Sequence, residues 1–329
     1  MAKQFSSVVL RSISTLVIVL ILSFFITRIA YRNPAAMLAP RNATQESIDA
    51  VARSLRLDDP WYLQLWYYLF RGPDIQGAPM GLMHWPPALG YSFRKQAPVT
   101  DLILAKAPVT LSLALGALVI WMTIAILSGV AAARWQGRLI DHVLAFFAYV
   151  GLSVPTFLSG ILISYFLFFQ LSNQGIHWFP SSGYVPLSED PLQWARHLAL
   201  PWATLAIAEI GLFQRMVRAS MLDVLGHDFI RTARAKGVPE GRVYFSHALK
   251  SALNPILTLG GLELAAIMGG AIVTETIFGL DGVGRMAIAA ALEGDFPVVI
   301  GTTIFAASAF IITTLAVDLV AQWRDPANR

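Results

Sequence analysis

A short basic segment between two apolar runs has the most distinctive residue spacing in this sequence. It begins at Asp228, a good N-cap and a favourable charge at a helix N-terminus. Gly237 suits the C′ position that ends a helix, and Pro239 follows where a second helix can begin. Ala233 and Ala235 leave little bulk in the middle, so a first helix of about 12 Å could enter another protein's groove. The three cations of this helix are Arg231, Arg234 and Lys236. From charge alone, an ordinary basic cytoplasmic loop is the simpler interpretation.

Two carboxylates, Glu209 and Glu263, lie within apolar runs. An ionisable residue in a membrane span is costly and is by default a functional hypothesis. The pair could face a hydrated pathway and meet a cationic group of a solute, such as a peptide amino terminus. Equally, each could pair with a polar neighbour or lie protonated between helices. Glu275, near the end of its run, is open to a structural or a gating role.

The motifs of several enzyme classes are absent. The sequence has no G-x-x-x-x-G-K-[ST], because none of its lysines follows a glycine, and it has no H-E-x-x-H or G-x-S-x-G. Its 6 histidines are scattered, and it has 0 cysteines. We therefore expect no catalytic residues and no cofactor or metal in this chain, which would need a separate ATPase to use ATP.

The composition is that of an integral membrane protein. Of 329 residues, 56% are hydrophobic and 13% charged, where a soluble chain carries about 25% charge. The net charge of +4 could indicate nucleic acid binding. The excess of Lys and Arg that cytoplasmic loops carry explains it more simply, so no nucleic acid partner is expected.

Six apolar runs are long enough to cross the hydrocarbon layer, which predicts an all-α polytopic membrane protein. The first is short and extends back to Val8–Leu10; a cleaved signal peptide is its rival interpretation. The runs are Ser12–Thr27, Ala107–Ala133, Val143–Phe169, Leu198–Met216, Pro255–Val273 and Pro297–Val317.

Charge sets the expected orientation. The loop at 134–138 and the segment from Arg215 to Lys250 are basic, whereas the loops at 170–197 and 274–296 hold one arginine each. The positive-inside rule then places both termini and the basic segment in the cytoplasm. The expected divisions are a tail and first span at 1–30, an extracytoplasmic segment at 31–100, a transmembrane core at 101–322 and a cytoplasmic tail at 323–329.

The 31–100 segment is the one sizeable part outside the spans. Thr44–Ser54 has the apolar spacing of an amphipathic helix. Trp61–Phe70, WYLQLWYYLF, predicts an aromatic-rich helix at the membrane interface. Gly72–Gly90 is rich in Gly and Pro and should form an irregular loop.

The basic segment resembles the EAA loop of ATP-binding-cassette (ABC) importer permeases. TARAKG, followed by HALKSALNP, is similar to the loop of the oligopeptide/dipeptide branch, which typically reads DYVRTARAKG. In that family the loop, here 228–250, is the coupling helix that docks into the ATPase subunit, with Ala233 expected nearest the ATPase groove. The coupling residues that the resemblance implies are Asp228, Arg231, Ala233, Arg234, Ala235, Lys236 and Gly237.

Three further stretches resemble the same family. GLSVPTF, which contains Pro155, is similar to GLSxPxF, and VTETIFGLDGVG, which contains Glu275, is similar to VETxFxxPGxG. Asp281 departs from the second pattern, where proline is usual. Asp318 and Asp325-Pro326 match a C-terminal pattern. The candidate pathway residues are Pro155, Glu209, Glu263 and Glu275.

The resemblance implies the permease subunit of a type I ABC importer in the bacterial cytoplasmic (inner) membrane, with six spans and a cytoplasmic coupling helix. Its partners would be a second homologous permease, ABC ATPase subunits that bind ATP and Mg, an extracytoplasmic solute-binding protein and membrane lipid. Di- or oligopeptides are the expected solutes, with glutathione or nickel as alternatives. An ion-coupled secondary transporter using Glu209 and Glu263 is a less favoured hypothesis, and an intramembrane enzyme a distant one.

Overall fold

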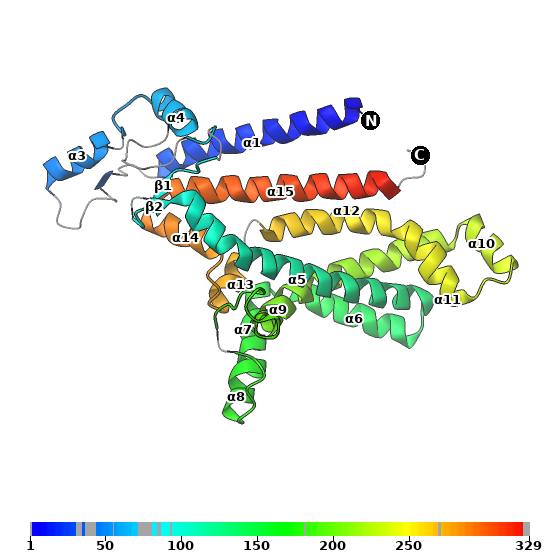
Figure 1. Cartoon of the computed structure of the whole chain (residues 1–329). Coiled ribbons are helices and arrows are strands. Elements are labelled where there is room, and N and C mark those ends of the chain that lie inside the picture. The colour runs from blue at the N-terminus through cyan, green and yellow to red at the C-terminus, as the bar shows by residue number, and fades with distance from the viewer. Residues whose placement is uncertain are drawn as a thin grey trace. The chain divides into compact units, whose positions relative to one another are not determined.

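The computed structural model describes residues 2–30, 35–36, 44–54, 56–71, 81–83, 87–92, 94–180, 182–268 and 271–324. Most of the irregular loop expected at 72–90 and the C-terminal Asp325-Pro326 lie outside these residues. The described part of the chain is helical apart from one two-stranded ribbon and the connections (Figure 1). An all-α polytopic fold is thereby confirmed.

The chain divides into two compact units. The N-terminal unit comprises residues 1–110 and 281–311, and the core unit comprises residues 111–280 and 312–329. Two long helices, α5 (Val99–Arg134) and α15 (Phe296–Arg324), contribute residues to both units.

Helices dominate the N-terminal unit. They are α1 (Ala2–Ala30), α3 (Gln45–Ser54), α4 (Trp61–Phe70), α14 (Val283–Glu293) and the first parts of α5 and α15. The strands β1 (Tyr91–Ser92) and β2 (Ala97–Pro98) pair antiparallel, with Tyr91 opposite Pro98. The helices predicted over Thr44–Ser54 and Trp61–Phe70 are confirmed: Thr44 precedes the first turn of α3, and Pro60 is the N-cap of α4.

The ribbon is fastened to the start of α15. The Ser92 hydroxyl donates a hydrogen bond of 2.5 Å to a carboxylate oxygen of Asp295, and both residues are buried. Arg94 donates through Nε to the carbonyl of Glu293. Burial raises the pKa of Asp295, although the hydrogen bond from Ser92 opposes that change.

The core unit is built around the 35-residue helix α9 (Pro191–Leu225). Asp190 caps α9 by accepting hydrogen bonds from the amides of Leu192 and Gln193. The other helical segments of this unit, besides parts of α5 and α15, are α6 (Leu139–Ser153), α7 (Thr156–Ile163), the π-helical η1 (Ser164–Gln170), α8 (Leu171–Asn173), α10 (Asp228–Ala235), α11 (Glu240–Arg242), the π-helical η2 (Val243–Ala248), α12 (Leu249–Met268) and α13 (Ile272–Ile277).

Among the described residues, 5 helical stretches are long and apolar enough to cross a membrane. They are Ser12–Ile29, Val99–Arg134, Thr156–Asn173, Glu240–Met268 and Phe296–Val317. The helix α6 is apolar but shorter, and α9, which contains the predicted fourth run, is long but falls outside this group.

The predicted third run, Val143–Phe169, is not one helix. It is divided between α6 and α7 at Val154, whose backbone is extended at φ −91 and ψ 120. Pro155 follows and is the N-cap of α7. The proline ring disfavours helical geometry in the preceding residue and removes a backbone donor, which explains the break.

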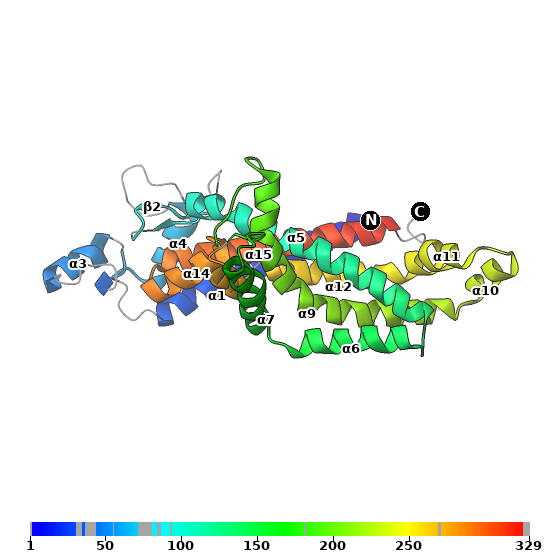
Figure 2. The same cartoon turned by 90° about the horizontal axis from the view of Figure 1, so that it is seen from below.

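The helix α6 packs along α9 (Figures 1 and 2). Two glycines permit a close approach. A Cβ atom at Gly151 would stand 2.8 Å from the carbonyl oxygen of Ile207, and one at Gly211 would collide with the carbonyl oxygen of Ala148. Small residues of this kind allow two helix backbones to touch.

An aromatic cluster lies deeper in the core unit. The rings of Trp121 on α5 and Phe213 on α9 are fully buried with centroids 4.3 Å apart. A Cβ atom at Gly260 on α12 would stand 3.3 Å from Trp121. The cluster therefore joins α5, α9 and α12.

Candidate functional site

The basic segment begins with the helix α10. Its N-cap is His227, with an extended backbone at φ −74 and ψ 152, and no side chain caps the helix. The prediction that Asp228 is the N-cap is therefore wrong by one position, because the turn that closes α9 places the extended residue at His227. Asp228 is the first helical residue, where its charge still favours the helix N-terminus. Its carboxylate pairs with Arg231 at 3.1 Å on the exposed surface.

The end of α10 agrees with the prediction. Lys236 is the C-cap, and Gly237 has φ +76, a conformation that glycine adopts far more readily than other residues. Pro239 is the N-cap of α11. Across the turn, Arg234 pairs with Glu240 at 2.8 Å between Nε and a carboxylate oxygen. The predicted helix–turn–helix is confirmed and is closed by this ion pair.

The two faces of α10 differ in exposure. Ile230 and Ala233, three residues apart, are buried within the chain. Ala233, which we expected nearest the ATPase groove, shares the inward face of α10 with Ile230. Phe229 and Arg231 are exposed, and so are Ala235 and Lys236. The outer face of α10 therefore presents the ring of Phe229 together with the cations Arg231 and Lys236.

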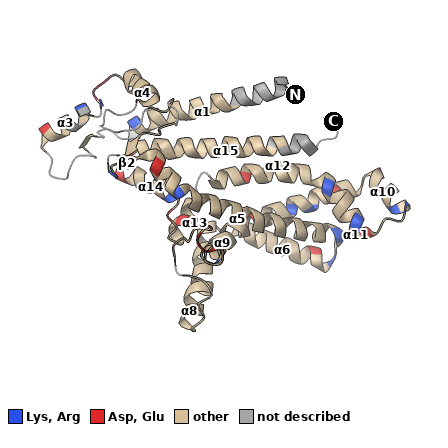
Figure 3. Ribbon diagram, in the orientation of Figure 1, with Lys and Arg blue, Asp and Glu red and all other residues tan. Residues whose placement is uncertain are grey.

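Positive charge gathers at this end of the core unit. Figure 3 shows the ribbon coloured blue, for Lys and Arg, at several places on and around α10 and α11. The cations from the last part of α9 to the first turn of α12 are Arg215, Arg218, Arg231, Arg234, Lys236, Arg242 and Lys250.

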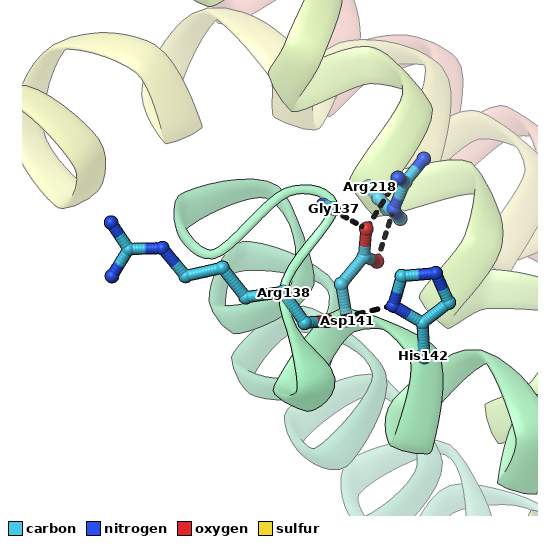
Figure 4. A network of polar contacts seen from close by, with 5 residues as sticks. All are labelled: Gly137, Arg138, Asp141, His142 and Arg218. Atoms are coloured by element: carbon cyan, nitrogen blue, oxygen red, sulfur yellow. Dashed lines mark hydrogen bonds and ion pairs between the residues drawn. The ribbon is translucent and has the colours of Figure 1, made fainter.

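A partly buried ion pair joins α6 to α9 (Figure 4). Arg218 donates from Nε and from a terminal nitrogen to the two carboxylate oxygens of Asp141, each at 2.7 Å. The same carboxylate accepts from the amide of Gly137 at 2.9 Å, and His142 contacts the carbonyl of Arg138 through Nδ1. Sequence analysis missed this network, since its main partners are 77 positions apart.

Of the four candidate pathway residues, the structure brings Glu209 and Glu263 together. They lie on α9 and α12, which pack against each other. One oxygen of Glu209 is buried and has no hydrogen-bond partner in the part of the chain that the structure describes. Pro155 starts α7, and Glu275 is fully buried in α13.

The described residues contain no group of three or more His, Cys, Asp or Glu side chains that could hold a metal ion.

The chain matches two family descriptions. Residues 122–329 match the binding-protein-dependent transport system inner membrane component, and residues 4–114 match the N-terminal component of the same systems.

Relatives resemble the chain along nearly its whole length. A Brucella abortus (strain 2308) protein named as a peptide transport system permease is 37% identical over 98% of this chain and 97% of its own. The oligopeptide transport system permease protein AppB of Bacillus subtilis is 34% identical, covering 96% of each chain. The glutathione transport system permease protein GsiC of Escherichia coli is 33% identical over 96% of this chain and 95% of its own.

A solved structure shares the fold. A chain of the MetNI methionine ABC transporter, in an inward-facing conformation, aligns with 69% of this chain and 97% of its own, at 16% identity and a TM-score of 0.51. The protein described here therefore belongs to the binding-protein-dependent permeases of ABC importers, which are membrane-spanning transport subunits, not enzymes, and which work with an ATPase and a solute-binding protein.

Proposed function

We propose that this chain is a permease subunit for di- or oligopeptides in the bacterial cytoplasmic membrane. It would pair with a second homologous permease around one translocation pathway. A peptide as the transported solute is supported by the similarity, over nearly the full chain, to permeases named for peptide and oligopeptide transport. Glutathione, itself a peptide, is the second candidate because a permease named for it is 33% identical.

The proposed orientation places both termini and the segment from α10 to η2 in the cytoplasm. The cations at the end of α9 and around α10 support it, because cytoplasmic loops are enriched in Lys and Arg. Single cysteines test it cleanly in a chain with 0 native cysteines. Cysteines at Gly175 and Gly294 should react with an impermeant thiol reagent added outside, and those at Gly137 and Gly241 should not. Outside labelling at Gly241 would overturn the orientation.

We propose that the outer face of α10 docks into the ATPase, which binds ATP and Mg. The supporting observation is the exposed Phe229 among cations on a helix whose inward face is fixed by Ile230 and Ala233. ATP binding would close the ATPases, draw the two coupling helices together and open the pathway outward. Hydrolysis would reset it. The coupling residues of the inward face would then act by holding the helix in place.

We propose that Glu209 and Glu263 meet the amino terminus of the peptide. A pair of carboxylates with one buried, unpaired oxygen suits an ammonium group, which supplies both charge and hydrogen-bond donors.

The deciding experiment for the solute uses the whole importer. The complex would be purified with its binding protein, and the co-purified ligand identified by mass spectrometry. Reconstituted complex should then import a labelled form of that ligand with ATP. A di- or oligopeptide supports the proposal, glutathione supports the second candidate, and a bound metal ion would overturn both.

A further inference from the structure

We infer that α4 lies flat in the lipid headgroup region, with its aromatic face on phospholipid, at the membrane surface where α1 ends. This lipid contact is independent of the solute and of the direction of transport.

The helix α4 presents an apolar surface that the chain does not cover. None of its residues is buried. Tyr62, Trp66 and Phe70, at i, i+4 and i+8, form a stripe along one face. Leu63 and Trp61 flank the stripe, and the exposed fractions of these five residues run from 39% to 57%. Such a face needs an apolar or interfacial partner.

Beyond the stripe, α4 makes contacts with the rest of its unit. The Gln64 side chain donates to the carbonyls of Leu57 and Asp59, at 2.9 and 2.7 Å. The guanidinium of Arg56 stands 4.0 Å from the centre of the Tyr67 ring. These contacts fix the rotation of the helix, so the aromatic stripe cannot turn inward.

The stripe is continuous with the membrane-facing surface of α1. The ring of Trp61 lies on that of Phe25, with centroids 5.3 Å apart. Phe25 belongs to the apolar stretch Ser12–Ile29, whose Leu22, Ile26 and Ile29 are exposed. Phe25 is about one helical turn, roughly 6 Å, from the end of that stretch. This contact sets α4 at the depth where Trp and Tyr concentrate in membrane proteins.

Arginines at the edge of the aromatic stripe favour phospholipid as the partner of this surface. Arg71, at the end of α4, lies 5.9 Å from the Tyr67 ring, which Arg56 also covers. At the end of α1, Arg28 stands over Phe24. An apolar stripe bordered by arginines matches the order of acyl chain and phosphate in a lipid leaflet.

Spin labelling tests this inference in the complete importer reconstituted in phosphatidylcholine vesicles. Nitroxides would be attached to single cysteines replacing Tyr62, Trp66 or Phe70, one variant at a time. The control is Glu46→Cys on α3, an exposed polar position of the same unit. Frequent collisions of the nitroxide with oxygen indicate that it lies in lipid, and frequent collisions with a water-soluble nickel chelate indicate that it lies in water.

At the three stripe positions oxygen should dominate by several-fold, and at Glu46→Cys the nickel chelate should dominate. Dominance of the chelate at the stripe would overturn the inference. So would immobilisation of the stripe labels, with loss of oxygen contact, on adding solute-loaded binding protein, because the face would then dock protein.

A second measurement uses the native aromatic residues. Phosphatidylcholine brominated near the headgroup should quench part of the tryptophan fluorescence. That part should shrink in the Trp61→Phe/Trp66→Phe double variant. Equal quenching of the wild type and the double variant would contradict the proposed lipid contact.

Discussion

Arg218 donates two hydrogen bonds of 2.7 Å to Asp141, and these bonds connect the first turn of α6 to α9. Farther along the same interface, Gly151 and Gly211 bring the two backbones together. The helices α6 and α9 are therefore held together at more than one point of their interface. The helix α10 follows α9 after a short turn, and Val154 and Pro155 form the non-helical joint at the end of α6.

This ion pair should contribute measurably to stability. The side chains of Asp141 and Arg218 are 7% and 30% exposed. A double-mutant cycle with alanine should therefore give a coupling energy of about 1–3 kcal/mol in the free energy of unfolding. The matched control is the exposed pair Asp228 and Arg231, whose coupling should be about 0.5 kcal/mol or less. Equal coupling in the two cycles would mean that the buried pair does not fasten α6 to α9.

Asp295 should make the stability of the N-terminal unit depend on pH. Burial raises its pKa in the folded chain, so the folded state holds the proton more tightly than the unfolded state does. The contribution to stability is complete below the unfolded pKa and is lost as pH rises through the folded pKa. Asp295→Asn keeps an oxygen that can accept from Ser92 and does not ionise.

The measurement is thermal unfolding of the purified chain between pH 4 and pH 8. Relative to Asp295→Asn, the wild type should lose stability as pH rises. Asp295→Ala should be less stable than the wild type at low pH, because the buried Ser92 hydroxyl loses its acceptor. Parallel curves for the wild type and Asp295→Asn would contradict this prediction.

Local sequence signals predicted the local structure well. The bounds of α4 follow from an aromatic run bordered by Pro60, and the end of α10 follows from the positive φ that Gly237 adopts. The inward position of Ala233 was not predictable, because the phase of a short helix depends on what packs against it. The contact between Asp141 and Arg218 depends on α6 lying along α9, a tertiary relationship that spacing does not encode.

The carboxylate pair should matter for peptide movement and not for assembly. The double variant Glu209→Gln/Glu263→Gln should lower peptide import at least tenfold, while subunit association and basal ATP hydrolysis persist. The reason is that a neutral amide cannot balance the charge of an ammonium group within the membrane. Glu189→Gln, at an exposed turn, is the control. Unchanged peptide import by the double variant would assign both residues a structural role.

Gly237 should be required for the turn after α10. Valine there would be strained, because φ is +76 and a β-branched side chain avoids that conformation. Gly237→Val should reduce co-purification of the ATPase and hydrolysis stimulated by the solute-loaded binding protein, at normal membrane abundance. Gly241→Val is the matched control, because Gly241 has open space around its Cβ position and lacks a positive φ. If Gly237→Val kept wild-type ATPase association and stimulated hydrolysis, the segment around α10 would be an ordinary basic loop.

The two alanines of α10 should separate a supporting role from a docking role. Ala233→Glu places a charge on the buried face beside Ile230, so it should loosen the helix and increase protease cleavage within residues 228–242 even without the ATPase. Ala235→Glu places the same charge on the exposed face, so the isolated permease should resist protease as the wild type does. Both variants should lose ATPase association, one through misplacement of α10 and the other through repulsion or bulk at the contact. Normal association in Ala235→Glu, measured by co-purification, would show that this part of the outer face does not touch the ATPase.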